Sequence, residues 1–106
     1  MSTATWAALA EPHRREMLML LLEGPRPVGD LVERLGLSQP GTSKHLRVLR
    51  EAGLVRVHRE AQRRVYALEP APLAELDAWL APYRRMWKEG LDALERHLES
   101  TSTKED

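Results

Sequence analysis

The chain has 106 residues, of which 42% are hydrophobic and 30% are charged, and its formal net charge at pH 7 is zero. This length suits one folded domain, and this composition excludes an intrinsically disordered chain. The absence of cysteine excludes disulfide bridges, thiolate metal sites and cysteine nucleophiles, and it agrees with a cytoplasmic location. No apolar run is long enough to cross a bilayer, so we expect no membrane partner.

The zero net charge hides an uneven distribution of charged residues. Residues 38–66 contain seven basic and two acidic side chains, a local charge of +5, and the rest of the chain carries the compensating −5. A basic stretch in an otherwise acidic protein is typical of a phosphate-binding surface. Charge alone leaves open the alternative that this is a solvated basic face.

Two helices are predicted at the start of the chain, over residues 5–9 and about 12–23. Pro12 suits the first turn of the second helix, and Gly24 and Pro25 end it. This second helix is apolar around nearly its whole circumference, so we expect it at the centre of the core.

Two further helices follow, over about 28–35 and 39–52. The first ends at Gly36. Ser38 is a favourable N-cap for the second, and Gly53 is a favourable C-terminal stop.

The helix over 39–52 is amphipathic. Thr42, Leu46 and Leu49 recur at helical spacing and predict a buried stripe. The face opposite this stripe carries polar and basic side chains: Gln39, Ser43, Lys44 and Arg47.

The sequence period then changes from helix to strand. Val55 and Val57 alternate with polar residues, and 63–68 is the expected partner strand of a hairpin over about 55–68. Three arginines lie near its tip: Arg59, Arg63 and Arg64.

A long final helix follows Pro70 and Pro72, with Pro82 expected to kink or interrupt it. Its large apolar residues have nearly heptad spacing, which is typical of a helix that packs on another helix. Together with the first helix it predicts a homodimer interface made of Trp6, Leu9, Leu76, Leu80, Tyr83, Trp87, Leu91, Leu94 and Leu98. The aromatic residues Trp79, Tyr83 and Trp87 could instead line a ligand pocket, and a dimer crevice could be both. We expect residues 1–99 to form the domain and 100–106 a disordered tail.

The order of these elements, α-α-α-α-β-β-α, predicts a mainly helical fold with a small β-hairpin wing, the winged helix-turn-helix. In such a fold the helix over 39–52 fits the DNA major groove, where Gln, Ser, Lys and Arg can bond to base edges. The wing arginines would then reach the DNA backbone or the minor groove.

Three stretches resemble the ArsR/SmtB family of regulators. They are Leu-Ser-Gln-Pro-Gly-Thr-Ser-Lys-His-Leu-Arg-Val-Leu-Arg-Glu-Ala-Gly-Leu-Val over 37–55, Ala-Leu-Ala-Glu-Pro-His-Arg-Arg over 8–15, and Arg-Arg-Val-Tyr-Ala-Leu over 63–68. The resemblance covers about residues 6–98. It implies a repressor of transcription that forms a dimer through its first and last helices. It also implies that the repressor releases DNA when an effector binds.

The resemblance also implies roles for individual residues. Gln39, Ser43 and Lys44 match base-reading positions, and Ser38 and His45 match backbone-contacting positions. Thr42 belongs with the latter two as a backbone or packing residue, and His45 faces either DNA or another helix. Gly41 departs from the pattern, and we expect it to lower helix stability by roughly 0.5–1 kcal/mol rather than to allow a closer approach to DNA.

Metal-sensing motifs of the family are missing. A C-x-C-D-L motif would enter the third helix where this chain has Pro-Val-Gly-Asp-Leu over 27–31. The final helix offers Asp77, Asp92, His97 and Glu99 without the required spacing. Because the histidines at 13, 45, 58 and 97 are scattered, we expect no metal site and no cofactor.

Two other classes of function stay as alternatives. A protein-docking module should present an apolar or aromatic face, whereas the outward face of the helix over 39–52 is polar and basic. An enzyme should show a phosphate loop, a nucleophile with its base or a zinc helix motif, and we find none. The expected partners are therefore double-stranded DNA, with a near-palindromic operator, a second copy of the chain and an unidentified small-molecule effector.

Overall fold

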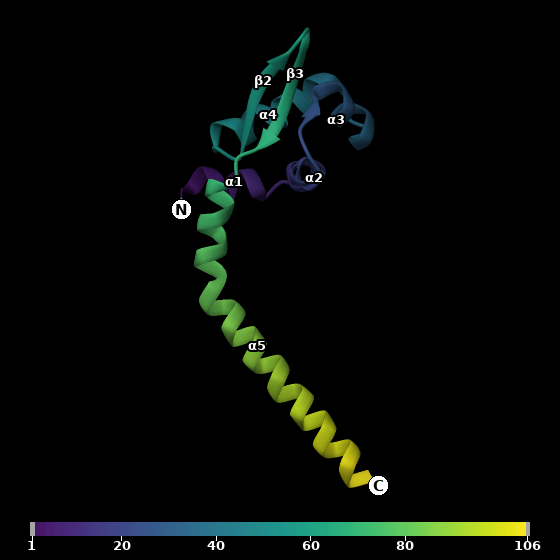
Figure 1. The fold of residues 1–106 in the computed structure, drawn as a ribbon, viewed down its shortest axis with the longest axis vertical. Coiled ribbons are helices and arrows are strands. Elements are labelled where there is room, and N and C mark those ends of the chain that lie inside the picture. The colour runs from purple at the N-terminus through teal and green to yellow at the C-terminus, as the bar shows by residue number, and fades with distance from the viewer. Residues whose placement is uncertain (1, 106) are drawn as a thin grey trace. The chain divides into compact units, whose positions relative to one another are not determined.

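The structure is a computed structural model, and it describes residues 2–105. The chain divides into two compact units, residues 1–75 and 76–106. The elements in chain order are α1 (Thr3–Leu9), α2 (Pro12–Leu22), β1 (Arg26–Pro27), α3 (Val28–Leu35), α4 (Gln39–Glu51), β2 (Val55–Glu60), β3 (Arg63–Leu68) and α5 (Ala71–Glu105). Figure 1 labels all of these elements except β1.

The core of the N-terminal unit is formed by residues that helices α1 to α4, the loop before β2 and the strands β2 and β3 turn inward. The largest fully buried apolar side chains are Met17, Leu31, Leu46, Leu49 and Leu54. Helix α2 is predicted at the centre of the core, and one face of it lies there, but its apolar residues are not buried all round the helix. Met19 is 69% exposed and Leu22 77% exposed, because the rest of the unit covers only the face of Met17, Leu18 and Leu21.

The helix boundaries of the N-terminal unit follow local capping chemistry. Ser38 Oγ accepts a hydrogen bond of 3.1 Å from the Gly41 backbone N–H, so the predicted N-cap of α4 is confirmed. Gly36 and Gly53 adopt φ angles of 67° and 76°, the left-handed conformation that ends a helix. A Cβ on residue 41 would lie 3.0 Å from Ser38 Oγ, so glycine at this position leaves room for the capping hydroxyl.

The sheet has three antiparallel strands in the order β1-β3-β2. The hairpin β2–β3 is as predicted, but the sequence analysis missed β1, in which Arg26 pairs with Tyr66 and Pro27 with Val65. The observed order of elements is therefore α-α-β-α-α-β-β-α. A two-residue strand has no periodicity of its own and exists only through its pairing with β3.

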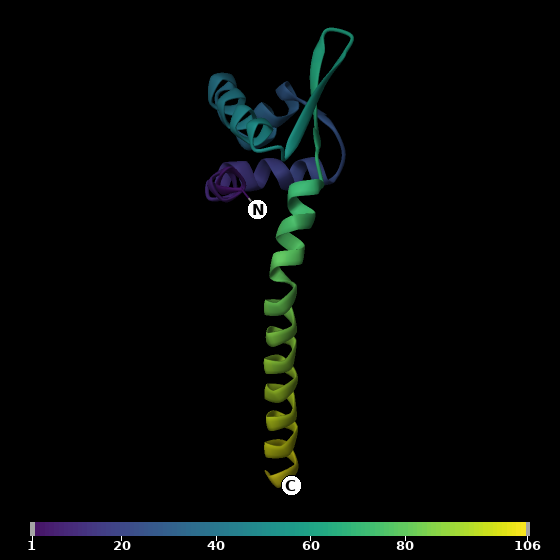
Figure 2. The ribbon, with the colours of Figure 1, turned by 90° about the vertical axis from the view of Figure 1, so that its left-hand side faces the viewer.

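The hairpin is the wing, residues 55–68. Its turn at residues 61–62 contains Ala61 with a φ of 54°, a conformation in which alanine is strained. The hairpin tip extends beyond the helices of the N-terminal unit in both views (Figures 1 and 2). Its arginine-bearing end is therefore free of the unit's core.

Helix α5 is not interrupted at Pro82, which lies inside the helix. It also runs through residues 100–105, where the sequence analysis expects a disordered tail, and the Thr101 hydroxyl donates a 3.0 Å hydrogen bond to the His97 carbonyl. Helix α5 therefore does not end at residue 99, where the domain is expected to end. Within residues 2–105, no helix is both long and apolar enough to span a membrane.

Candidate nucleic-acid interface

Helix α4 turns its apolar stripe inward, as predicted. Thr42, Leu46 and Leu49 are all 0% exposed. The Thr42 hydroxyl donates a 2.9 Å hydrogen bond to the Ser38 carbonyl, so its polar group is satisfied inside the unit. This places Thr42 among the packing residues and fixes which side of α4 faces outward.

The outward side of α4 is polar and basic. Gln39, Lys44 and Arg47 are exposed, and Ser43 is half-buried. A groove of about 330 Å³ runs between α4 and the wing, and it is lined by Val28, Gln39, Ser43, Arg47, Arg50, Arg64 and Tyr66. The groove brings Gln39, Ser43 and Arg47 together with Arg64 of the predicted wing site, whereas Lys44 is not among its lining residues.

Arg50 is a residue of this surface that the sequence analysis missed. It is exposed and lines the groove beside Arg47 and Arg64. It also lines a smaller recess with Arg59. The basic charge of 38–66 was visible in the sequence, but the convergence of α4 with β3 depends on tertiary packing.

The wing arginines gather positive charge at one end of the hairpin. Arg59, Arg63 and Arg64 are all exposed, and Arg59 lies directly opposite Arg64 in the strand register. Like charges at opposite positions destabilise a strand pair. Among the described residues, no acidic side chain lies within ion-pair distance of these three arginines, so their charge is available to an anionic partner.

Arg56 behaves differently from the arginines near the tip. It donates hydrogen bonds to the Leu68 carbonyl at 2.9 Å and to Glu69 Oε1 at 2.6 Å. Its charge is thus partly neutralised at the base of the hairpin. The positive potential of the wing therefore lies toward its tip.

Ser38 and His45, the two predicted backbone-contacting residues, have different surroundings. Ser38 is exposed at the start of α4, where it also serves as the cap. His45 faces α2: its ring stacks on His13 with centroids 5.8 Å apart, and its Nδ1 accepts a 3.2 Å hydrogen bond from Arg14 Nη1. Partial burial lowers the pKa of His45 below its usual value, which favours the neutral imidazole.

Glu11 lies against the same pair of histidines. Its Oε1 is 3.1 Å from His13 Nδ1, and its Oε2 accepts a 3.1 Å hydrogen bond from the Arg14 backbone N–H at the start of α2. Desolvation acts to raise the pKa of Glu11, but the hydrogen bonds from His13 and from the backbone outweigh it and lower this pKa. The histidines are scattered along the sequence, but the fold brings His13 and His45 together.

The predicted interface residues divide into two groups. Leu9 is half-buried against the core of the N-terminal unit, whereas Trp6 is 43% exposed. On α5, Leu76 and Leu80 are half-buried. Seven other large apolar residues of α5 are 42–66% exposed and form what we call the α5 stripe: Trp79, Tyr83, Met86, Trp87, Leu91, Leu94 and Leu98.

Comparison with known proteins gives a consistent result. Residues 11–57 match the family model described as "Bacterial regulatory protein, arsR family". The chain is 39% identical over 95 residues to the HTH-type transcriptional regulator Rv2034 of Mycobacterium tuberculosis, covering 90% of this chain and 86% of that protein. It is 34% identical over 73 residues to the transcriptional repressor SdpR of Bacillus subtilis, covering 69% and 81% of the two chains.

Solved structures agree with the sequence relatives. The repressor BigR of Xylella fastidiosa superposes with a TM-score of 0.62 at 34% identity, over 76% of this chain and 82% of that one. HlyU of Vibrio cholerae superposes with a TM-score of 0.63 at 36% identity, over 76% and 88%. The predicted winged helix-turn-helix is therefore confirmed, and the relatives are named as regulators rather than enzymes. The chain belongs to the arsR family of bacterial regulatory proteins and is a DNA-binding regulator of transcription.

Proposed function

We propose that this regulator is a homodimeric repressor that inserts α4 into the DNA major groove and lays the wing on the backbone or in the minor groove. The observation that carries this proposal is the orientation of α4. Its apolar side is fully buried, so its polar side is free to approach DNA. Gln39, Ser43, Lys44 and Arg47 on that side supply the donors and acceptors that distinguish base edges.

The wing supports the second contact. Arg59 and Arg64 lie opposite each other without acidic partners among the described residues, and phosphates would relieve their mutual repulsion. Arg50 and Arg64 line the groove beside α4. Base contacts from α4 and phosphate contacts from these arginines would then come from adjacent parts of one surface.

The α5 stripe supports the homodimer. Seven large apolar side chains are 42–66% exposed on one helix, a pattern that marks an interaction surface. Their nearly heptad spacing suits a second helix of the same kind. A twofold dimer would present two copies of α4 to a near-palindromic operator, with half-sites one DNA turn or a multiple apart.

Repression is proposed from the names of relatives. SdpR is named a transcriptional repressor, and the match from Agrobacterium fabrum is named a biofilm growth-associated repressor. HlyU of Vibrio cholerae is named an activator. Each name belongs to the relative, and a reporter placed behind the bound operator would give the sign of regulation for this chain.

The decisive experiment compares specific with non-specific binding. Dissociation constants are measured by fluorescence anisotropy, at one salt concentration, for DNA upstream of the chain's own gene and for a scrambled duplex. The triple variant Q39A/S43A/K44A should lower the ratio of the two affinities by about tenfold or more, because each lost base contact removes about 1–3 kcal/mol of discrimination.

Lys88→Ala is the matched control, since it removes one exposed lysine from α5. It should leave the affinity ratio unchanged. An unchanged ratio in the triple variant would refute the assignment of α4 as the base-contacting helix. Protein capture with no DNA binding at all would instead favour a protein-docking module.

A further inference from the structure

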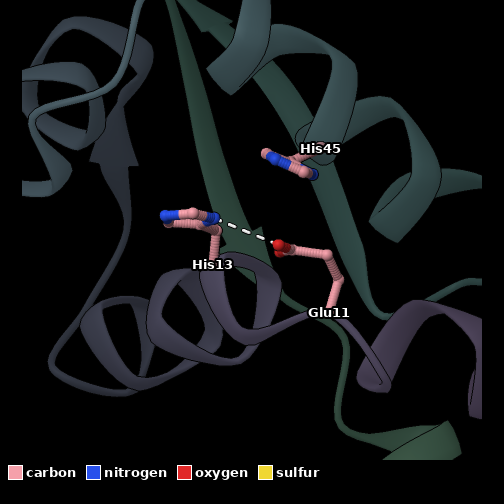
Figure 3. Close-up of side chains that lie close together, drawn as sticks. All are labelled: Glu11, His13 and His45. Atoms are coloured by element: carbon pink, nitrogen blue, oxygen red, sulfur yellow. Dashed lines mark hydrogen bonds and ion pairs between the residues drawn. The ribbon is translucent and has the colours of Figure 1, made fainter.

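A cluster of three potential metal ligands lies beneath α4, on the side away from the proposed base-contacting residues. Glu11 is the N-cap of α2, His13 is in its first turn and His45 is in α4. One ligand atom from each residue lies within 4.8 Å of both others, and all three residues are half-buried. Figure 3 shows the three side chains pointing into the same space between the two helices.

We propose that Glu11, His13 and His45 bind one divalent transition-metal ion of the zinc class, which joins α4 to the start of α2. Two imidazoles and one carboxylate are a donor set that Zn²⁺ and its neighbours in the first transition row accept. Three protein ligands leave one tetrahedral position for water, and His13, with 44% of its side chain exposed, gives solvent access to the cluster.

The observed spacing is close to what an ion requires. Bonds of about 2.0–2.1 Å in a tetrahedral zinc site separate neighbouring ligand atoms by about 3.4 Å. Glu11 Oε1 and His13 Nδ1 are already 3.1 Å apart. Because a carboxylate only accepts, His13 Nδ1 now carries a hydrogen, which must lie on Nε2 before Nδ1 can bind an ion. With that tautomer, closure of the site mainly needs a side-chain adjustment of His45. Neither backbone has to unwind, because each ligand sits on or beside a formed helix.

An ion bound to His45 would replace the hydrogen bond that this residue now makes with Arg14. A guanidinium only donates, so His45 Nδ1 is the acceptor in its bond with Arg14 and the ring hydrogen lies on Nε2. A neutral imidazole that binds an ion through either nitrogen carries its hydrogen on the other, and it then has no lone pair left for Arg14. Ion binding and the Arg14–His45 hydrogen bond are therefore mutually exclusive.

Arg14 has other partners when this bond is lost. Its Nε donates to the Ala8 carbonyl at 2.8 Å and its Nη2 donates to the Ala7 carbonyl at 3.1 Å. It can therefore stay at the end of α1 after His45 is released. Its positive charge beside the ion lowers the affinity, whereas the Glu11 carboxylate raises it.

The test uses the full chain after removal of metal by a chelator. Zn²⁺ is titrated in by calorimetry, and Co²⁺ is titrated in a parallel experiment that follows visible absorption. We expect one ion per chain, and a rise in Co²⁺ absorption as water ligands are replaced. Saturating Zn²⁺ should also raise the Tm, because the ion binds the folded chain.

Two double variants test whether Zn²⁺ binding depends on the cluster. Each removes two imidazoles, so their effects can be compared directly. H13Q/H45Q should weaken Zn²⁺ binding by about tenfold or more and abolish the rise in Tm. H58Q/H97Q, which removes the histidines outside the cluster, should bind as the unsubstituted chain does. Circular dichroism at equal concentrations verifies that both variants fold.

A third variant tests the carboxylate. Glu11→Gln keeps an oxygen that can accept from the Arg14 N–H, but it loses the charged ligand, so it should weaken Zn²⁺ binding while the helix content is retained. The proposal is overturned if the unsubstituted chain takes up no ion, or if H13Q/H45Q and H58Q/H97Q bind Zn²⁺ equally. Neither measurement involves DNA, so failure here leaves the proposed repressor function standing.

Discussion

Helices α4 and α5 each carry an apolar stripe at helical spacing, and the two stripes have different surroundings. On α4 the stripe of Thr42, Leu46 and Leu49 is 0% exposed. On α5 the seven residues of the α5 stripe are 42–66% exposed. The N-terminal unit covers the first stripe with its own residues, whereas the second stripe has the exposure of an interaction surface, which we propose a second copy of the chain covers.

Under our proposal, this difference assigns DNA contact to α4 and assembly of copies to α5. Because α4 is held from within its unit, its polar side can make DNA contacts without contributing to the core. In the proposed dimer, the exposed α5 stripe would join two copies without using the residues that would touch DNA. Substitutions on the two helices should therefore affect different observables.

The largest effect is expected from the buried stripe of α4. Leu46→Ala removes a fully buried side chain and should lower the free energy of unfolding by about 2–5 kcal/mol, through lost transfer energy and a cavity. Urea unfolding followed by circular dichroism measures it. A loss much smaller than this would mean that α4 is not part of the core, and the contrast with α5 would fail.

Two glutamates introduced into the α5 stripe should weaken the proposed dimer. Leu91→Glu combined with Leu94→Glu puts four like charges into a homodimer interface and should raise the dimer dissociation constant by about 100-fold or more. Sedimentation equilibrium gives this constant, and circular dichroism should still report a folded N-terminal unit. If the molecular mass were unchanged at all concentrations, the stripe would not be the dimer interface.

Charge removal on the wing should change DNA binding and leave assembly intact. Arg63→Ala combined with Arg64→Ala should weaken binding to all sequences and reduce the slope of log K against log salt by about 2 in magnitude, one phosphate contact for each arginine. The sedimentation behaviour should match the unsubstituted chain. A slope that did not move would show that the wing is not on phosphate.

A smaller effect is expected at the hairpin turn. Ala61 has a positive φ of 54°, which costs an alanine about 1 kcal/mol relative to its preferred conformations. Ala61→Gly should therefore stabilise the N-terminal unit by up to about 1 kcal/mol, a gain reduced by the greater freedom of glycine in the unfolded chain. The midpoint of urea unfolding is the readout, and a lower midpoint would mean that Ala61 makes a contact worth more than its strain.

The smallest effect concerns pH. The hydrogen bond from Arg26 Nη1, 2.6 Å from Asp30 Oδ2, lowers the pKa of Asp30 below its usual value. A lowered carboxyl pKa contributes stability above the unfolded-state value of about 3.9 and loses it as the pH falls through the folded-state pKa. Asp30→Asn should therefore lower the free energy of unfolding at neutral pH but not in acid, and equal differences at both pH values would argue against this ion pair.

The features that the sequence predicted correctly depend on neighbours along the chain. The cap at Ser38, the stops at Gly36 and Gly53 and the inward stripe of α4 each follow from spacing within one helix. The cap and the stops form wherever the helix forms, and the helical spacing decides which side of α4 is apolar, although burial of that side needs the rest of the unit.

The features that it missed depend on residues far apart in the chain. Strand β1 exists through pairing with Tyr66 and Val65, and the approach of His13 to His45 depends on the packing of α2 against α4. Arg14 and His45, which share a hydrogen bond, are 31 positions apart. Met19 and Leu22 are apolar and yet exposed, because the number of neighbours available to cover α2 is a property of the fold and not of that helix.

The central claim is that the polar side of α4 faces DNA. Because the chain contains no cysteine, Lys44→Cys introduces a single thiol on this side, and Lys88→Cys introduces a matched thiol on α5. The measurement is the rate at which each thiol reacts with a maleimide, with and without saturating duplex DNA at low salt. Our account predicts that DNA slows the reaction at position 44 several-fold and leaves position 88 unchanged. An unchanged rate at position 44 in the DNA complex would contradict it.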